Sequence, residues 1–309
     1  MRSVHIGVLM TCHNRRDTTL ACLDALFKQE LPDAVIFEVY LVDDGSKDGT
    51  AEAVIQQYPS VKVIKGCGNF YWCGGMRMAW AEAMKEDYDY YLWLNDDTML
   101  YPNAIEILLE TSKKVDGSSQ VAHSIIVGST CDPITKQRTY GGYIFNPEKM
   151  NFVSQMPVIP TNSIQTCHTM NGNIVLISKG VFDSIGNISS EFTHAIGDID
   201  YGLRATRKGL SILLSPGFQG VCEAGRPSLW TLPETPLAKR LRVLHSPKGL
   251  PPKEYMIFHK RHNGKWIVAI LKLYLRVFSP LLWQYMKKWN NYKHIIAFIF
   301  VYSNGYIVQ

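Results

Sequence analysis

The N-terminal part of the chain alternates short apolar runs with longer segments in which apolar residues recur every three or four positions. The runs predict buried strands and the recurrence predicts amphipathic helices. Strands are predicted at 4–10, 35–42, 61–65 and 90–94, and helices at 17–27, where Asp17 is the cap, 51–58 and 76–85. This alternation predicts right-handed crossovers, a mainly parallel sheet flanked by helices, and loops that collect on one edge.

The predicted strand at 90–94 is apolar throughout and ends directly at Asn95, Asp96 and Asp97. Such a strand is typically buried on both faces. Because ligands gather beyond the carboxyl ends of strands in open α/β sheets, we expect the chemistry at this edge, where a divalent cation would bridge the carboxylates to nucleotide phosphates. The alternative is a turn, or a cap for a helix that begins near Pro102.

After a predicted helix at 104–114, the pattern changes to shorter strands that proline and glycine interrupt. They are predicted at 121–127, 138–145, 151–158, 174–177 and 211–214, with helices at 179–185 and 198–208. This change favours a mixed or antiparallel extension of the sheet, which we expect to form the acceptor side of a cleft. Six prolines between 227 and 252 then predict a poorly structured connector.

Composition and charge narrow the class of protein. With 309 residues and 46% hydrophobic content, the chain suits one large α/β domain with an appendage. Residues 1–254 carry a net charge of −3, which gives no indication of nucleic-acid binding, whereas residues 255–309 carry eight Lys or Arg and no Asp or Glu. A tail with this bias predicts an anionic partner.

The seven cysteines have no regular short spacing, which argues against a disulfide framework or a zinc ribbon. The chain enters its first strand without an apolar signal segment before it. We therefore expect a cytoplasmic protein.

Asp43 and Asp44 follow the second predicted strand, in the string 42–50, Val-Asp-Asp-Gly-Ser-Lys-Asp-Gly-Thr. Carboxylates at a strand end can accept hydrogen bonds from a base imide and a ribose hydroxyl, and Gly45 lets the turn bend tightly. A turn with a helix cap would need only Asp48. The two additional carboxylates therefore favour nucleotide binding.

An aromatic and glycine-rich loop is predicted at 66–75, directly before a helix. Its backbone N–H groups, including those of Gly74 and Gly75, would face a diphosphate or a sugar. Trp72 would stack on the sugar ring. For Phe70 and Tyr71 a packed aromatic loop is the alternative.

Four motifs occur in the order and spacing of family 2 glycosyltransferases. They lie at 11–15, 42–50, 95–97 and 194–204. Over residues 3–225 the sequence resembles these inverting enzymes of the Rossmann-like GT-A fold, and its glycine-rich segment is similar to that of bacterial surface-polysaccharide transferases such as rhamnosyltransferases. The resemblance implies a nucleotide-diphosphate sugar donor, a divalent metal (Mn²⁺ or Mg²⁺) and direct displacement.

The resemblance also assigns roles to single residues. Asp43 matches the base-recognising Asp, Asp97 the last, metal-binding carboxylate of the Asp-x-Asp motif, and Asp198 the catalytic base. With these residues, we expect the donor and cofactor site to contain Thr11, Asn14, Arg15, Asp44, Trp72, Gly74, Gly75 and Asp96.

The sequence departs from the family pattern at three places. Asn95 stands where the metal motif usually begins with Asp, and Gly197 stands where a Glu normally precedes the catalytic Asp. Many members carry a metal-binding His after the last core strand, where this chain has Cys222 and Glu223. Glu223 or His245 would then complete the metal site.

Asp198 also fits the base role on chemical grounds, because an inverting transfer needs one carboxylate to take the proton of the acceptor hydroxyl. Asp198 and Asp200 open a predicted helix. The alternative interpretation is simple electrostatics, since the helix dipole favours negative charge at its start.

The interpretation that follows is a metal-dependent inverting glycosyltransferase. It would move a sugar from a UDP- or dTDP-sugar to a hydroxyl of a glycan or a lipid-linked acceptor in surface-polysaccharide synthesis. A sugar-phosphate nucleotidyltransferase is one alternative, although residues 11–15 lack the glycine-rich loop with Arg and Lys that it would need. A catalytically inactive sugar-binding or scaffold subunit is the other, because of Asn95 and Gly197.

The C-terminal tail is predicted to be helical and amphipathic. Residues 266–278 are apolar except for Lys272 and Arg276, which share a face with Lys265, and Pro280 then breaks the helix. Further apolar residues follow, flanked by Lys287, Lys288 and Lys293. No apolar run reaches the length of roughly 18 residues that a spanning helix needs, so we expect the tail to lie on the inner face of the cell membrane. The alternatives are that this apolar face packs on the core, or that it packs on a second subunit as a homodimer interface. The predicted parts are a transferase domain at 1–225, a connector at 226–254 and the tail at 255–309.

Overall fold

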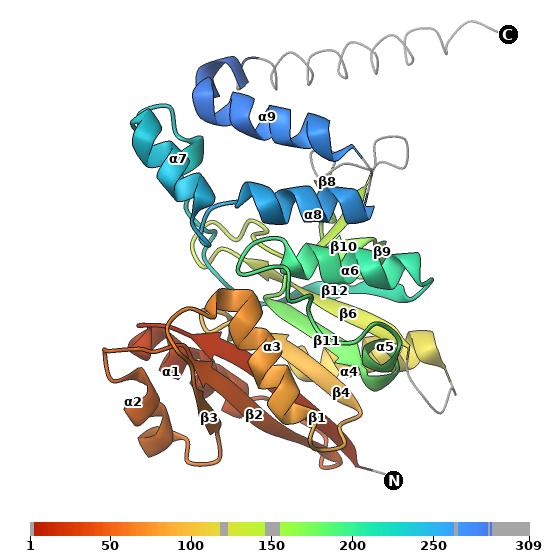
Figure 1. Ribbon diagram of the computed structural model, residues 1–309. Helices are drawn as coiled ribbons and strands as arrows, with labels where there is room; N and C mark the ends of the chain where they lie inside the picture. The colour runs from red at the N-terminus through yellow and green to blue at the C-terminus, as the bar shows by residue number, and fades with distance from the viewer. Residues whose placement is uncertain (1–2, 118–122, 146–154, 263–264, 284, 286–309) are drawn as a thin grey trace, which may run out of the picture. The chain divides into compact units, whose positions relative to one another are not determined.

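The computed structural model describes residues 3–117, 123–145, 155–262, 265–283 and 285. The chain divides into two compact units, Met1–Gly225 and Arg226–Gln309 (Figure 1). Parts of the strands predicted at 121–127 and 151–158, and the tail at 286–309 with Lys287, Lys288 and Lys293, lie outside the described residues.

The first half of the first unit is a parallel sheet, as predicted. Its strands are β1 (Val4–Cys12), β2 (Val35–Asp43), β3 (Lys62–Lys65) and β4 (Tyr90–Leu94), in the order β3-β2-β1-β4. All adjacent pairs are parallel. The carboxyl ends of these strands therefore lie at one edge of the sheet.

The second half of the sheet is mixed, which confirms the expected change of pattern. Beyond β4 the order continues with β11 (Ile174–Ser178), β6 (Ser124–Cys131), β12 (Ser211–Val221) and β5 (Met99–Leu100), and β9 (Gln165–Cys167) also pairs with β12. Strand β11 is antiparallel to both β4 and β6. A small antiparallel sheet contains β10 (Thr169–Met170), β7 (Gly142–Phe145) and β8 (Gln155–Pro157).

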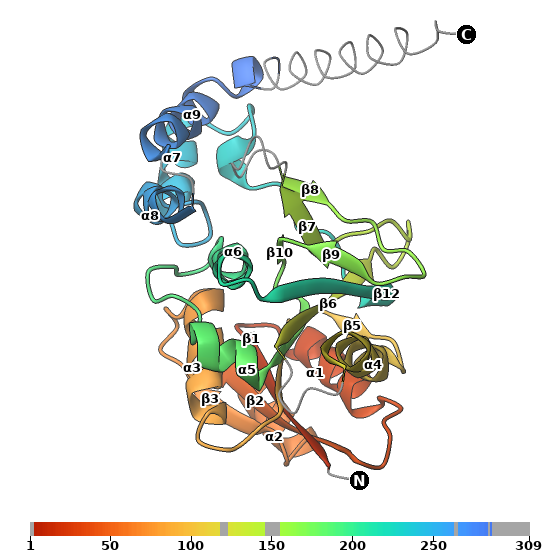
Figure 2. The ribbon, with the colours of Figure 1, turned by 90° about the vertical axis from the view of Figure 1, so that its right-hand side faces the viewer.

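Helices cover both faces of the large sheet. They are α1 (Arg16–Phe27), α2 (Thr50–Gln57), α3 (Tyr71–Ala83), α4 (Ala104–Asp116), α5 (Lys179–Ile185) and α6 (Gly197–Arg207). Figure 2 shows α3 and α5 on one face and α1 and α4 on the other. The unit therefore has three layers, helix, sheet and helix.

Strand β4 is buried on both faces, as its sequence predicts. Leu92 and Leu94 join the aliphatic core that includes buried residues of α1 and α4. Tyr91 and Trp93 point to the opposite face, where an aromatic cluster contains Trp80 of α3, Phe182 of α5 and Tyr201 of α6. This alternation anchors the strand that ends at the acidic pair.

Helix α3 begins at Tyr71, five residues before the start that the sequence predicts. The predicted loop at 66–75 is therefore wrong in its second half, and Trp72, Gly74 and Gly75 lie in the first turns of the helix. The physical reason is Asp44, which accepts hydrogen bonds from the backbone N–H groups of Phe70 and Tyr71, both at 2.9 Å. A carboxylate at this place starts a helix by satisfying donors that have no partner within it.

The second unit is more helical than the sequence predicts. It contains a 3₁₀ turn, η3 (Leu229–Thr231), and the helices α7 (Leu237–His245), α8 (Pro252–His262) and α9 (Trp266–Phe278). The poorly structured connector expected over 226–254 is thus wrong, because prolines at 236 and 252 stand at helix starts, where the missing N–H costs nothing. Helix α9 has the predicted bounds. None of the described helices is long and apolar enough to cross a membrane.

Candidate functional site

The carboxyl ends of β1, β2 and β4 and the amino end of β11 meet at one edge of the sheet. Because β11 runs antiparallel to β4, with Ile174 opposite Leu94, the residues that precede β11 lie level with those that follow β4. The backbone N–H of Asn95 donates to the Asn173 carbonyl at 3.1 Å. The antiparallel strand thus brings a polar segment to the edge where the acidic residues collect.

The two carboxylates after β2 have different environments. Asp43 is buried, and its Oδ1 accepts the Ser46 N–H at 2.8 Å. Asp44 is also buried. It accepts the Gly68 N–H on Oδ1 at 2.8 Å, and on Oδ2 it accepts the N–H groups of Phe70 and Tyr71, at the start of α3. Both oxygens of Asp44 therefore hold the β3–α3 loop, and of the pair Asp43 is the better candidate for contact with a nucleotide base.

The β1–α1 loop is fastened to the β2–α2 loop. Asn14, with a left-handed φ of 52°, donates its backbone N–H to Ser46 Oγ at 2.8 Å and accepts the Lys47 N–H on Oδ1 at 2.7 Å. His13 Nδ1 lies 2.6 Å from the Asp44 carbonyl oxygen. Asn14 thus fixes the turn that directly follows Asp43.

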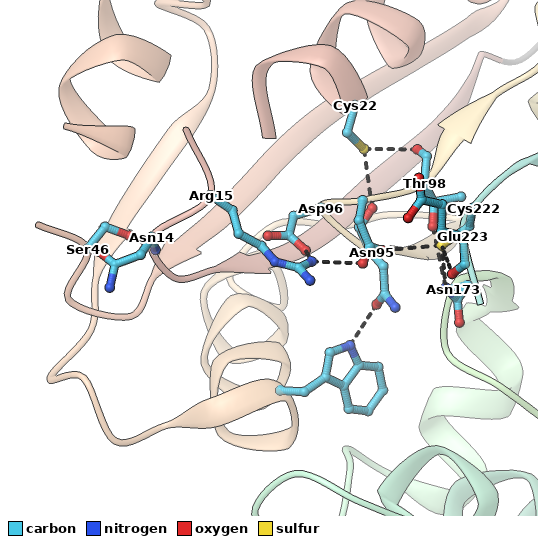
Figure 3. Close-up of polar contacts among 12 residues, drawn as sticks. Asn14, Arg15, Cys22, Ser46, Asn95, Asp96, Thr98, Asn173, Cys222 and Glu223 are labelled. Carbon is cyan, nitrogen blue, oxygen red and sulfur yellow. Dashed lines mark hydrogen bonds and ion pairs between the residues drawn. The ribbon is translucent and has the colours of Figure 1, made fainter. Parts of the chain in front are cut away.

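Arg15 joins the β1 end to the β4 end. Its Nη1 lies 2.9 Å from Asp96 Oδ1 and 2.8 Å from Asp97 Oδ2, and Figure 3 shows Arg15 directed at Asp96. The Asp96 side chain is 9% exposed and the Asp97 side chain is 32% exposed. Burial raises the pKa of Asp96 to about 6, with Arg15 opposing the rise and Asp97 adding to it. Of the two carboxylates, Asp97 is the one that a ligand can reach.

Cys222 contacts the other oxygen of Asp97. Its Sγ lies 3.5 Å from Asp97 Oδ1 and 3.6 Å from Asn173 Nδ2 (Figure 3). Burial, and to a smaller degree Asp97, raises the pKa of the Cys222 thiol to about 12. The thiol is therefore protonated at neutral pH and donates weakly to Asp97.

The two other predicted metal ligands occupy different settings. Glu223 is exposed directly after Cys222. His245 belongs to the second unit, where its Nε2 lies 3.3 Å from Tyr274 Oη. Over the part of the chain that the structure describes, no three His, Cys, Asp or Glu side chains form a group that could hold a metal ion.

The residues at the β4 end nevertheless fit a divalent cation that a diphosphate helps to bind. Asp97 offers an accessible carboxylate, and one buried oxygen of Asp96, Oδ2, has no hydrogen-bond partner among the described residues. Mg²⁺ commonly uses one or two carboxylates together with substrate phosphates and water, and Mn²⁺ favours the same oxygen ligands. Asp97 would hold such an ion, and the ion would stabilise the negative charge of a leaving diphosphate.

Trp72 is packed within the site. Its Nε1–H donates to Asn95 Oδ1 at 2.7 Å, so the amide that replaces the usual first Asp of the metal motif has a defined partner. Gly75 follows in the same helix, and a Cβ there would lie 2.1 Å from Thr11 Oγ1. Gly75 therefore lets α3 pack closely against β1. Gly74 is likewise buried in α3.

Asp198 opens helix α6, and its carboxylate is held by backbone donors. Oδ2 accepts the Gly172 N–H at 3.0 Å and Oδ1 accepts the Ile199 N–H at 2.8 Å. The side chain remains partly exposed. Burial raises the pKa of Asp198, although these N–H groups and a hydrogen bond from the Asn171 side chain oppose the rise. A fixed carboxylate with an elevated pKa is well suited to accept a proton.

The neighbouring positions explain why Asp198 differs from Asp200. Asp200 is fully buried, and its Oδ2 lies 3.1 Å from Arg204 Nε within the same helix. Arg204 also donates to the carbonyls of Ile185 and Asn187, so this pair fastens α6 to the end of α5 and to the segment after it. At Gly197 a Cβ would lie 2.4 Å from Cys73 Sγ, so the thiol occupies the space that a glutamate would need.

Sequence reasoning missed the segment Asn171, Gly172 and Asn173. These residues contact the Asp198 carboxylate and the backbone of Asn95. The available signal was a polar Asn-Gly-Asn string directly before a buried strand. Its meaning depends on β11 being antiparallel, which places the start of that strand, and not its end, at the site.

Comparisons with known proteins agree with this arrangement. The model of the family described as glycosyl transferase family 2 matches residues 7–173, more than half of the chain. An uncharacterized glycosyltransferase of Rickettsia prowazekii is 24% identical over 200 residues, which cover 61% of this chain and 55% of that protein. The hyaluronan synthase of Streptococcus pyogenes is 31% identical over 111 residues, which cover 34% of this chain and 26% of the synthase.

A solved structure shows the same fold. GalNAc-T7, determined with UDP, GalNAc and Mn²⁺, has a TM-score of 0.56 and 15% sequence identity over 86% of this chain and 56% of that chain. At this identity the likeness concerns the fold alone. The chain spans about half the length of GalNAc-T7 and of the Rickettsia protein, and about a quarter of the synthase.

Proposed function

Because the chain belongs to glycosyl transferase family 2 and has the GT-A fold, we propose that it is an inverting, metal-dependent hexosyl- or deoxyhexosyltransferase. Its donor would be a nucleotide-diphosphate sugar, with UDP and dTDP as the candidate nucleotides. Its acceptor would be a hydroxyl of a glycan or of a lipid-linked saccharide in surface-polysaccharide synthesis.

One observation carries the proposal. Two consecutive residues contact the two parts of the site, which are the candidate base and the β4 end. The Gly172 N–H donates to the Asp198 carboxylate, and the Asn173 carbonyl accepts the Asn95 N–H. Adjacent Cα atoms are about 3.8 Å apart. The candidate base and the strand end that carries Asp97 therefore lie on either side of one short segment, and this closeness supports a direct displacement between them.

The reaction assigns a separate task to each carboxylate. The acceptor oxygen attacks the anomeric carbon, the bond from that carbon to the diphosphate oxygen breaks with its electron pair, and the hydroxyl proton passes to Asp198. Asp97 would hold the metal ion, which would stabilise the negative charge of the leaving diphosphate, while Asp43 recognises the nucleotide base. Arg15 holds Asp96 and Asp97 in place.

Turnover of a panel of UDP-, dTDP- and GDP-sugars, with Mn²⁺, Mg²⁺ or EDTA, tests this function. We expect one donor to release nucleoside diphosphate in a metal-dependent manner and to give a product of inverted anomeric configuration by NMR. Release of pyrophosphate from a nucleoside triphosphate and a sugar phosphate would show a nucleotidyltransferase instead. Donor binding without turnover in the presence of acceptor saccharides would show an inactive sugar-binding subunit.

Exposed apolar and basic side chains in the second unit support a peripheral role of the protein at an anionic membrane surface. Exposed apolar side chains on α9 and just after it include Ile267, Val268, Leu271, Phe278, Leu281, Leu282 and Tyr285. Lys265 and Lys272 are exposed beside them, and residues 255–309 contain no acidic residue. Arg276 departs from the shared basic face expected from the sequence, because its guanidinium lies 4.7 Å from the Trp230 ring centre and is partly buried there.

Basic residues beside an apolar helix face favour the interface of an anionic bilayer, where they bind lipid headgroups. Sedimentation of the full-length protein with phosphatidylglycerol vesicles tests this role. We expect salt-sensitive binding that Leu271→Asp with Phe278→Asp abolishes, while Ile134→Asp, at an apolar side chain that is 86% exposed in the first unit, has no effect. Loss of a dimer in the double variant, without any vesicle binding by the wild type, would identify the surface as a homodimer interface.

A further inference from the structure

The Trp72 indole lies against both parts of the site. Its Nε1–H binds Asn95 Oδ1, and the far edge of its ring lies on Gly172, where a Cβ would be 2.3 Å from Cζ2 and 2.6 Å from Cη2. Its ring also meets Trp93 of β4 edge to face, with centroids 5.6 Å apart. Contacts from three directions therefore fix the indole in one place.

The contacts with Gly172 and Asn95 lead to residues of the proposed reaction. Gly172 donates its N–H to the Asp198 carboxylate, and Asn95 directly precedes Asp96 and Asp97. The backbone beside Trp72 adds a further connection, since the Cys73 N–H donates to the Thr193 carbonyl, in the segment that leads to α6, at 3.1 Å. The start of α3 thus contacts the β4 end through Asn95. It also contacts two segments next to Asp198, one that contains Gly172 and one that contains Thr193.

We propose that Trp72 is a positioning residue that sets the distance and orientation of Asp198 relative to the β4 end. This role rests on the proposed function and is additional to the sugar stacking expected from the sequence. The contact with Gly172 leaves no room for a side chain at that position. The hydrogen bond from the indole explains the role of Asn95, which stands where the family motif has an acidic residue. Trp72 acts through Gly172 and Asn95 without taking part in the displacement itself.

Trp72→Phe tests the proposal, because it removes both the N–H donor and the ring edge that rests on Gly172. A small displacement of a catalytic group can cost on the order of 100-fold in rate. We expect kcat to fall by about 10- to 100-fold, while the thermal shift produced by UDP with Mn²⁺ stays that of the wild type. This separation of kcat from nucleotide binding would not result from a general loss of stability.

Trp80→Phe is the matched control in the same helix. Trp80 is fully buried in the aromatic cluster, and its Nε1–H has no hydrogen-bond partner among the described residues. The control therefore removes an indole from the core without removing a hydrogen bond to the site. We expect it to lower Tm at least as much as Trp72→Phe while kcat changes by less than about threefold, since no contact with Gly172 or Asn95 is lost.

A second pair of variants tests the contact itself by exchanging volume. Gly172→Ala should lower both Tm and kcat, because its methyl group would overlap the Trp72 ring edge. Trp72→Phe vacates that space, so the double variant should have a higher Tm and kcat than Gly172→Ala alone. Such recovery requires that residues 72 and 172 act on the reaction through one shared contact.

The outcomes distinguish this inference from the proposed function. If the wild type transfers no sugar from any donor, the proposed function fails and the positioning role fails with it. If the wild type transfers sugar but Trp72→Phe keeps kcat within twofold, or Trp80→Phe loses as much kcat, the positioning role alone is wrong. Absence of any recovery in the Gly172→Ala and Trp72→Phe combination would also overturn it.

Discussion

The acidic residues of the two halves of the sheet edge are all held by neighbouring groups, but they differ in how far they are exposed. In the parallel half, Asp44 is buried and accepts three backbone N–H groups. Nearer the mixed half of the sheet, Asp97 and Asp198 are held by neighbours yet remain partly exposed. Asp44 fastens a loop, whereas Asp97 and Asp198 can act on a substrate.

The difference shows that a carboxylate at the carboxyl end of a strand is not by itself a sign of chemistry. Buried backbone N–H groups require acceptors, and a carboxylate that supplies several of them stabilises the loop around a site. Asp44 and Asp43 are adjacent in the sequence and similarly buried, but their hydrogen-bond partners assign them separate tasks. Substitutions should therefore separate effects on turnover from effects on folding.

The largest expected effect is on turnover, from Asp198→Asn. Loss of a positioned base should lower kcat by roughly two to four orders of magnitude, because the amide cannot accept the acceptor proton. Donor affinity, measured by the thermal shift with UDP and Mn²⁺, should stay near the wild-type value. A near-normal kcat with weakened donor binding would instead place Asp198 in the donor site and contradict the assigned role.

Asp97→Ala should lower metal-dependent turnover by at least about two orders of magnitude, the scale of losing an electrostatic group that stabilises a leaving group. The fold should be retained, because the side chain lies at the sheet edge and is 32% exposed. Initial rates over a Mn²⁺ titration, with circular dichroism as the control for folding, make the measurement. Normal Mn²⁺-dependent rates in this variant would show that the β4 end does not bind the metal.

Asp44→Asn should affect folding more than chemistry. One of the two oxygens that accept backbone N–H groups becomes a donor, so we expect the free energy of unfolding to fall by about 1–3 kcal/mol. Urea denaturation measures the change, and Asp24→Asn, at an exposed carboxylate of α1, should leave the stability nearly unchanged. Unchanged stability in Asp44→Asn would contradict the structural role.

Asp96→Asn should give a smaller, pH-dependent gain in stability. The folded pKa of Asp96, about 6, lies above the value of roughly 3.9 of an unfolded Asp. The folded state therefore binds the proton more tightly, and stability falls as pH rises from about 4 through 6. Removing this ionisation should raise the free energy of unfolding at pH 7.5 in EDTA by about 1–2 kcal/mol. The gain should disappear near pH 4, and an equal gain at both pH values would show that ionisation of Asp96 is not its cause.

The sequence predicts the parallel half of the fold closely, because strand and helix periods alternate there without interruption. The bounds of Tyr90–Leu94 agree with the structure, as do those of Lys179–Ile185 in the mixed half. The prediction from sequence fails at the start of α3, because the cap there is supplied by Asp44, a carboxylate distant in sequence. Strand β12 also continues past Pro216 to Val221, because an irregular register with β6 accommodates the proline and Gly217.

The acidic residues of the site could be named from the sequence, since each directly follows a predicted strand or opens a predicted helix. Their partners could not. The contacts of Asp198 with Gly172, and of Trp72 with Asn95, join residues 26 and 23 positions apart. They follow from the antiparallel direction of β11 and from packing around the indole, and neither is encoded in local periodicity.

The pH dependence of kcat shows whether Asp198 accepts the acceptor proton, the step on which the proposed reaction depends. Because burial raises the pKa of Asp198, the wild-type rate should fall on the acid side at a pH above the ordinary Asp range. A protonated carboxylate cannot act as a base, so the remaining rate of Asp198→Asn should lose this acid limb, whereas Asp96→Asn should keep it. An acid limb that persists in Asp198→Asn and vanishes in Asp96→Asn would contradict the assignment of Asp198 as the base.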